Sequence, residues 1–159
     1  MLSLTPIIQQ LEHKPPSFNA LWFRQVAGAA EYAQIRPDAL PLPAAWVVRA
    51  NEKSKHLGER REEITVTFDV VIAIENARVH TPGETDDLLL QYRKAVKTEL
   101  LGSYPHDDTK AINYDGGRVL QYAEGDIYWA DTYSFVAEIT NYLPDPPPFE
   151  KAEYQEKLA

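Results

Sequence analysis

The chain has 159 residues, of which 44% are hydrophobic and 25% are charged, and its formal net charge is -8. This length and composition predict one soluble globular domain whose core is large enough to be stable without covalent cross-links. Cysteine is absent, which excludes a disulfide framework and a thiolate metal site, and the acidic balance disfavours a general nucleic-acid binder. No apolar run approaches the roughly 18 residues of a membrane span, and the first residues lack the pattern of a secretory signal.

A short helix is predicted near the N-terminus. Thr5 is a candidate N-cap, Pro6 suits the first helical position, and two prolines at 15–16 end the helix. Its apolar face is formed by Ile7, Ile8 and Leu11. We expect this helix to cover one face of a sheet. Residues 18–28 then predict a strand rich in aromatic side chains, and residues 36–43 predict a connection interrupted by prolines.

The central element is a long strand predicted over residues 62–75. Six apolar side chains occupy every second position and must therefore share one buried face: Ile64, Val66, Phe68, Val70, Ile72 and Ile74. The other face begins polar at Thr65, Thr67 and Asp69 and turns apolar at Val71 and Ala73, so we expect it to start in solvent and end covered. Strands usually have about 5–6 residues. A strand this long tends to project beyond its sheet toward a partner.

Residues 44–50 predict a second strand, short and buried on both faces. Between these two strands lies a polar stretch, 51–61, which predicts a hairpin with an extended loop. One interpretation is a solvated loop. The other is a protein-contacting arm in which Lys53, Lys55, Arg60 and Arg61 face an acidic neighbour.

The major helix is predicted over residues 82–101. Thr81, Pro82 and Glu84 have the form of a capping box, with Thr85 as a competing cap, and Gly102 suits the helix end. The apolar stripe has helical spacing: Leu89, Tyr92, Val96 and Leu100. This stripe predicts that the helix lies across the sheet.

The last third predicts a long connection over 104–117 with a turn at 115–117, then a hairpin of strands 118–123 and 127–142 around a turn at 124–126. Asp131 interrupts the apolar face of the final strand, which indicates either a bulge or a part of the sheet that is open to solvent or to a partner. Prolines end the sheet, and Phe149 begins a charged tail. We expect one domain over 1–143 and a proline-rich tail over 144–159.

The order of elements predicts an α+β fold in which a mainly antiparallel sheet has its helices packed mostly on one face. No catalytic or phosphate-binding motif is present in the sequence. The cluster most like a metal site is 106–108, with His80 as a further candidate, but adjacent ligands on a loop favour a solvated turn. Glu63 and Asp69 lie about 20 Å apart along one strand, too far to act as a pair. The sequence predicts no enzyme, no metal and no cofactor.

The element order resembles that of bacteriophage tail terminator proteins and related tail-completion proteins. The resemblance covers roughly residues 1–143: the short first helix, the strand pair with its charged stretch, the long alternating strand, the capped helix and the final hairpin ending in Ala137-Glu138-Ile139-Thr140. It implies a structural virion protein, assembled in the host cytoplasm, that forms a hexameric ring at the junction of tail and neck. Such a ring caps the tail tube protein, stops its polymerisation, meets the head-completion protein, and lets DNA pass without binding its sequence.

The resemblance implies no catalytic residues, and the candidate interface residues are Lys53, Lys55, Arg60, Arg61, Asp131 and Phe149. For the tail, a neighbouring subunit is the expected contact. Two alternatives stay open. One is another phage neck or baseplate adaptor with the same fold. The other is a small-ligand-binding or enzymatic domain with a pocket lined by Trp129, Tyr133 and Tyr92.

Overall fold

The computed structural model describes residues 2–34, 41–75, 82–123 and 126–141. They form an α+β domain with a five-stranded sheet in the order β1-β2-β3-β5-β4. Every strand pair is antiparallel except β1 with β2. The strands are β1 (Gln25–Ala27), β2 (Ala44–Gly58), β3 (Arg61–Glu75), β4 (Asn113–Ala123) and β5 (Asp126–Thr140). The helices are α1 (Thr5–Glu12), α2 (Ala29–Ala33) and α3 (Pro82–Leu100). The α+β prediction is confirmed.

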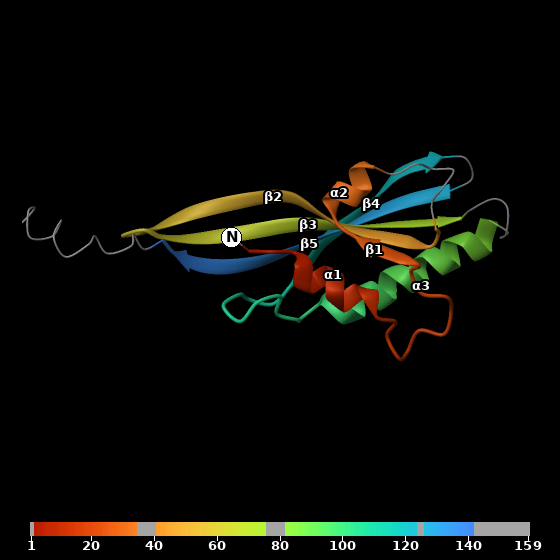
Figure 1. The fold of residues 1–159 in the computed structure, drawn as a ribbon, viewed down its shortest axis with the longest axis horizontal. Coiled ribbons are helices and arrows are strands. Elements are labelled where there is room, and N and C mark those ends of the chain that lie inside the picture. Colours follow the sequence, from red (N-terminus) through yellow and green to blue (C-terminus); the bar gives the residue numbers. More distant parts are fainter. Residues whose placement is uncertain (1, 35–40, 76–81, 124–125, 142–159) are drawn as a thin grey trace, which may run out of the picture.

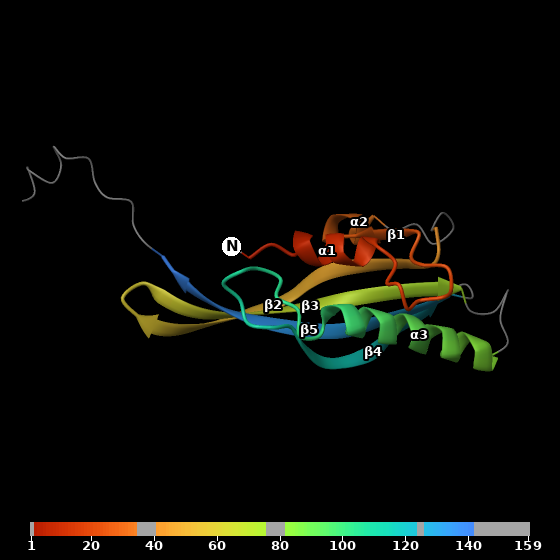
Figure 2. The ribbon, with the colours of Figure 1, turned by 90° about the horizontal axis from the view of Figure 1, so that it is seen from below.

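The alternating strand, β3, is the middle strand of the sheet, and its apolar face is buried, as its pattern predicted. All six apolar side chains of β3 are buried, and the least buried, Ile64, is only 7% exposed. Full burial of one such side chain contributes about 1.5–3 kcal/mol. The helices α1 and α3 lie against this face (Figure 2), with the α3 stripe that ends at Leu100 packed into the same core. The opposite face of β3 changes from half-buried threonines to a fully buried Ala73, also as predicted.

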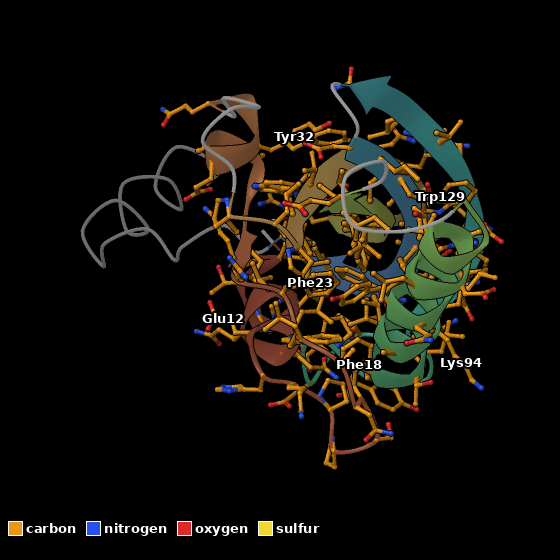
Figure 3. All side chains as sticks on the ribbon, turned by 90° about the vertical axis from the view of Figure 1, so that its right-hand side faces the viewer. Glu12, Phe18, Phe23, Tyr32, Lys94 and Trp129 are labelled. Carbon is orange, nitrogen blue, oxygen red and sulfur yellow. The ribbon has the colours of Figure 1, made fainter. Side chains whose placement is uncertain are left out.

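A second, smaller core lies on the back of the sheet, under α2. Tyr32 of α2 packs on Trp46 of β2 with ring centroids 5.6 Å apart, and small apolar residues of β3 and β5 complete the cluster. The side view in Figure 3 shows Tyr32 on the opposite side of the sheet from Phe18 and Phe23. The sequence did not predict this helix, because five residues are too few to show a periodic pattern.

Several predicted elements differ from the structure. The strand predicted over 18–28 is only Gln25–Ala27, because Phe18, Trp22 and Phe23 pack as an aromatic cluster against Tyr92 of α3. The first helix begins at Thr5 itself, with Leu4 as its N-cap. β4 begins at Asn113 and includes the glycines predicted as a turn, which form part of a register shift between Tyr114 and Gly116.

The C-terminal end of α3 agrees with the sequence. Gly102 has φ +78, and its N–H donates to the carbonyl of Ile112 at 3.2 Å. Thr85 lies inside α3 and is buried, so it is not the cap. The predicted capping box at Thr81, the connection over 36–40, His80, the turn at 124–125 and Phe149 with the rest of the tail lie outside the described residues.

Candidate interface: the projecting arm

The polar stretch predicted as a loop is instead an extension of the sheet. β2 continues to Gly58 and pairs with β3 as far as Arg61, and β5 follows β3 to the same end, where Arg61 is opposite Thr140. We call this three-stranded projection, residues 51–67 and 134–140, the arm. At about 3.3 Å per residue it extends roughly 25 Å. Figure 1 shows it projecting beyond the part of the sheet that the helices cover.

The two faces of the arm differ. On one face Ile64, Val66 and Phe135 are buried, and residue 110 of the α3–β4 connection donates a backbone hydrogen bond of 2.8 Å to Val136. We call the other face the open face: Lys53, Lys55, Glu63, Thr65, Val136 and Glu138. Each of its residues is exposed or half-buried, and among the described elements no helix lies over it. A sheet face of this kind is available to another protein.

The structure brings three of the predicted contact residues to this face and places the fourth at the tip. Lys53 and Lys55 lie beside each other on β2, and Arg61 pairs with Glu138 at 2.6 Å. Both members of that ion pair are about half exposed, so solvent screening leaves it worth little in stability. Arg60 is exposed in the turn. In the described part of the chain, no ion pair joins Lys53 or Lys55 to an acid.

The tip of the arm has an unusual backbone. Glu59 and Arg60 are the central residues of the β2–β3 turn, and their φ angles of 40 and 66 lie in the left-handed region. A two-residue hairpin turn with both φ angles positive favours Asn-Gly, because glycine has no Cβ and asparagine tolerates this region, whereas most other side chains lose about 1 kcal/mol or more there. Two charged residues therefore occupy positions where smaller residues would be more stable. Strained backbone of this kind clusters at functional sites, so the tip is a candidate contact.

Hydrogen bonds close the end of the arm. Glu62 accepts from Ser54 at 2.8 Å and from the Asn141 side chain at 3.2 Å, and these bonds hold the pKa of Glu62 below its usual range. The backbone N–H of Asn141 also donates to the carbonyl of Arg60 at 2.8 Å. The end of β5 is thereby fixed against the tip of the hairpin.

Asp131 is not on any open surface. It is 0% exposed and lies between β5 and α3, where Arg93 donates to both carboxylate oxygens. The Tyr114 hydroxyl and the Trp129 indole each donate to it at 2.9 Å. Burial alone would lower the Arg93 pKa, but the hydrogen bonds and the charge of Asp131 raise it above its usual range. Both carboxylate oxygens of Asp131 accept hydrogen bonds, which is the condition under which a buried charge is tolerated.

Both explanations offered for Asp131 from the sequence are therefore replaced. β5 has no register shift against β3 at this point, and the sheet there is covered by α3. The register shift lies on β4, and Gly117, opposite Asp131, leaves room for the carboxylate. An added Cβ at Gly117 would lie 2.4 Å from an Asp131 oxygen. The sequence showed an acid within an apolar stripe, which marked Asp131 as unusual. It did not show the ion pair, because the partner Arg93 lies on a helix that is distant in the chain.

The ligand pocket expected from Trp129, Tyr133 and Tyr92 does not form from these residues together. Tyr133 is 0% exposed, and burial raises its pKa strongly. A separate cavity of about 330 Å³ is lined by Tyr92 of α3 together with Leu21, Arg24 and Leu42. In the predicted metal-like cluster, a ring nitrogen of His106 lies 2.8 Å from the Ser3 carbonyl oxygen. Within the described residues no group of three or more acidic, histidine or cysteine side chains could hold a metal ion.

Comparison with known proteins gave a family match. In the described residues, no helix combines the length and the apolar character that crossing a membrane requires. A search of curated proteins gave no match. The family model for phage tail terminator proteins matches residues 1–142, which is nearly the whole chain. The chain therefore belongs to the phage tail terminator family, and its role is a structural one in the tail of the virion.

Proposed function

We propose that this protein forms a closed ring, with six subunits, that caps the tail tube and joins the tail to the head-completion protein. The observation that carries the proposal is the arm: a projection with an uncovered face, lysines that have no ion pair among the described residues, and a charged tip in a strained turn. In this proposal the open face and Arg60 contact the tube protein or the adjacent subunit. Family membership supports the tail role, and the architecture supports contacts made through the arm.

Unpaired sheet edges also support a ring. β1 covers only Ala44 to Trp46 of β2, so the outer edge of β2 beyond Trp46 has no strand partner among the described residues. β4 is the edge at the opposite side of the sheet. A surface with two different free edges suits head-to-tail contacts, and such contacts close into a ring when the rotation between subunits allows it. The net charge of -8 is compatible with a lumen through which DNA passes without adhering, because acidic walls repel phosphate.

The test reverses charge on the arm without changing its fold. The variant carries Lys53→Glu, Lys55→Glu and Arg60→Glu, and it leaves Arg61 in place because Arg61 pairs with Glu138. We expect tails of uncontrolled length and a loss of joined particles in an infection complemented by this variant, counted by electron microscopy. The thermal unfolding midpoint should stay close to that of the parent, because exposed charges contribute little to stability.

A matched variant controls for net charge. Lys14, Lys94 and Lys110 are also exposed, lie outside the arm, and give the same change in charge when all three are replaced by glutamate. This variant should still terminate tails. Tails of normal length from the arm variant, with its fold intact, would contradict the proposed role of the arm.

A further inference from the structure

The end of the molecule opposite the arm carries a cavity that the proposed cap does not use. Its volume is about 330 Å³, and most of its walls are apolar, formed by Leu21, Leu42 before β2, Ile74 of β3 and Leu88 of α3. Leu21 is 56% exposed, so this wall of the cavity is accessible from solvent. Figure 3 looks onto this end of the molecule. We call this site the end cavity.

Hydrogen bonds fix two walls of the end cavity. The backbone N–H of Arg24 donates to the Pro43 carbonyl at 2.8 Å, and the Tyr92 hydroxyl donates to the Leu21 carbonyl. The stretch that contains Leu21 and Arg24 is thereby tied to the start of β2 and to α3. Binding sites for apolar groups are usually preformed in this way.

Two opposite charges border the end cavity. Arg24 and Glu75 both line it, both are exposed, and neither forms an ion pair within the described residues. A second acid, Asp126 of β5, is opposite Glu75 in the sheet. The site therefore combines an apolar interior with one base and one acid that have no charged partner in the described part of the chain.

The tip of the arm carries an apolar side chain that belongs to neither core. Leu57 is the only apolar residue among residues 51–58, and it is half-buried without being part of either core. It lies in the register shift between His56 and Gly58, so it has no partner residue on β3. Bulges of this kind redirect a side chain, often at a functional position. Neither strand pairing nor core packing explains a leucine here.

Two charges at the tip also lack partners. Of the four charged residues in 58–62, Arg61 and Glu62 are held within the arm by the ion pair and the hydrogen bonds described above. Glu59 and Arg60 are exposed, and neither forms an ion pair in the described part of the chain. The tip thus presents one leucine, one acid and one base, and the end cavity presents an apolar interior, one base and one acid.

The tip cannot enter the cavity of its own chain. β3 runs from Arg61 at the tip to Glu75 beside the cavity, and it pairs with β5 over this whole length without a register shift. At about 3.3 Å per residue the two ends are roughly 45 Å apart. The occupant therefore comes from another chain. Contacts between opposite ends of successive copies are head-to-tail contacts, the kind that closes into a ring.

We propose that the tip of each arm docks in the end cavity of the adjacent copy of this chain. Leu57 enters the cavity, Glu59 faces Arg24, and Arg60 faces Glu75. The inference rests on the ring of the proposed function, and it names the adjacent subunit as the contact of the tip. The open face of the arm then remains for the tube protein.

Disulfide cross-linking tests the contact directly, because the natural chain has no cysteine. A chain that carries Leu57→Cys with Leu21→Cys should give, after mild oxidation of the ring, a ladder of linked chains on a denaturing gel without reductant. The control carries Leu57→Cys with Leu101→Cys. Leu101 is 44% exposed and does not line the end cavity, so this chain should give no ladder.

A charge exchange provides a second test that leaves the cavity walls unchanged. Glu59→Arg and Arg24→Glu, made singly, should each shift the mass measured by light scattering from the ring toward smaller species, because like charges then meet across the contact. The two changes together should restore the ring. Both residues are exposed, so the fold should be unaffected. Lys14→Glu, at an exposed lysine outside both surfaces, is the control and should leave the ring unchanged.

The outcomes separate this proposal from the cap itself. A ring of normal mass that gives no ladder, or an equal ladder from the Leu101 control, would overturn docking of the tip and leave the cap proposal intact. A double charge variant no better than the single ones would also count against it. Charge variants that form normal rings but no longer bind tube protein would show that the tip contacts the tube instead. If the natural chain forms no ring, alone or with tube protein, both proposals are wrong.

Discussion

Among single residues, Asp131 and Gly117 matter most to the way this domain holds together. The carboxylate of Asp131 has hydrogen bonds from Arg93, Tyr114 and Trp129, which come from α3, β4 and β5. One buried acid therefore ties α3 to the β4–β5 hairpin that follows it in the chain. Removing one partner of such a pair typically lowers stability by about 3–5 kcal/mol, because the other charge is left uncompensated.

Gly117→Ala should lower the free energy of unfolding by about 1–3 kcal/mol, because its Cβ would lie within 3 Å of Asp131, Trp129 and Tyr114 atoms. Denaturant unfolding followed by tryptophan fluorescence measures this, since Trp129 is in the contact. Gly83→Ala is the matched control: a Cβ there meets nothing within 4 Å, and alanine favours a helix by up to ~1 kcal/mol. Equal stability of the Gly117 variant and the parent would show that the side chains around Gly117 can move to make room for a Cβ.

At the level of elements, the β2–β3 hairpin is the feature that distinguishes this sheet. Its second half has almost no apolar residue on β2, yet it keeps strand pairing to the tip because β3 and β5 bury their apolar side chains on one face. The hairpin is thus supported from β5 and not from its own outer strand. In a projection built this way, the outer strand needs no apolar residues of its own and can carry charges.

Glu59→Asn combined with Arg60→Gly should raise the stability of the protein by about 1 kcal/mol, because Asn-Gly suits a turn in which both φ angles are positive. The same change removes the charged tip, so the proposed function predicts poorer tail termination from a more stable protein. Thermal unfolding and tail-length counts measure the two effects on one sample. Improved stability with normal termination would indicate that the tip is not a contact.

At the level of the whole molecule, family membership shows a tail structural role, and the shape of the chain suits repeated head-to-tail contacts. The arm projects at one end, and the cavity that Tyr92 helps to line is on the body. A subunit with different surfaces at its two ends assembles by contacts between unlike patches, and such contacts close only with a fixed rotation.

The mass in solution tests the ring. Light scattering at several concentrations should give a species near six times the chain mass of 18.1 kDa, or a monomer that converts to it when tube protein is added. Association should lower the monomer fraction as concentration rises, by mass action. A monomer or dimer whose mass does not change when tube protein is added would contradict the ring and favour the small-ligand alternative.

The sequence by itself determined the elements whose signal is local. The alternation in β3 and the stripe of α3 were sufficient to predict both elements, their buried faces and the α+β class, since each pattern reflects burial on one side of a regular element. Only the tertiary structure decided the rest. The polar half of β2 is a strand because β3 pairs with it, the aromatics at 18–23 are not a strand because Tyr92 packs on them, and Asp131 is buried because Arg93 reaches it. Tyr92 and Arg93 are distant in the chain from the residues they hold, and the polar half of β2 remains a strand because β3 is supported on its other side by β5, which is also distant in the chain. A local pattern carries no information about such partners.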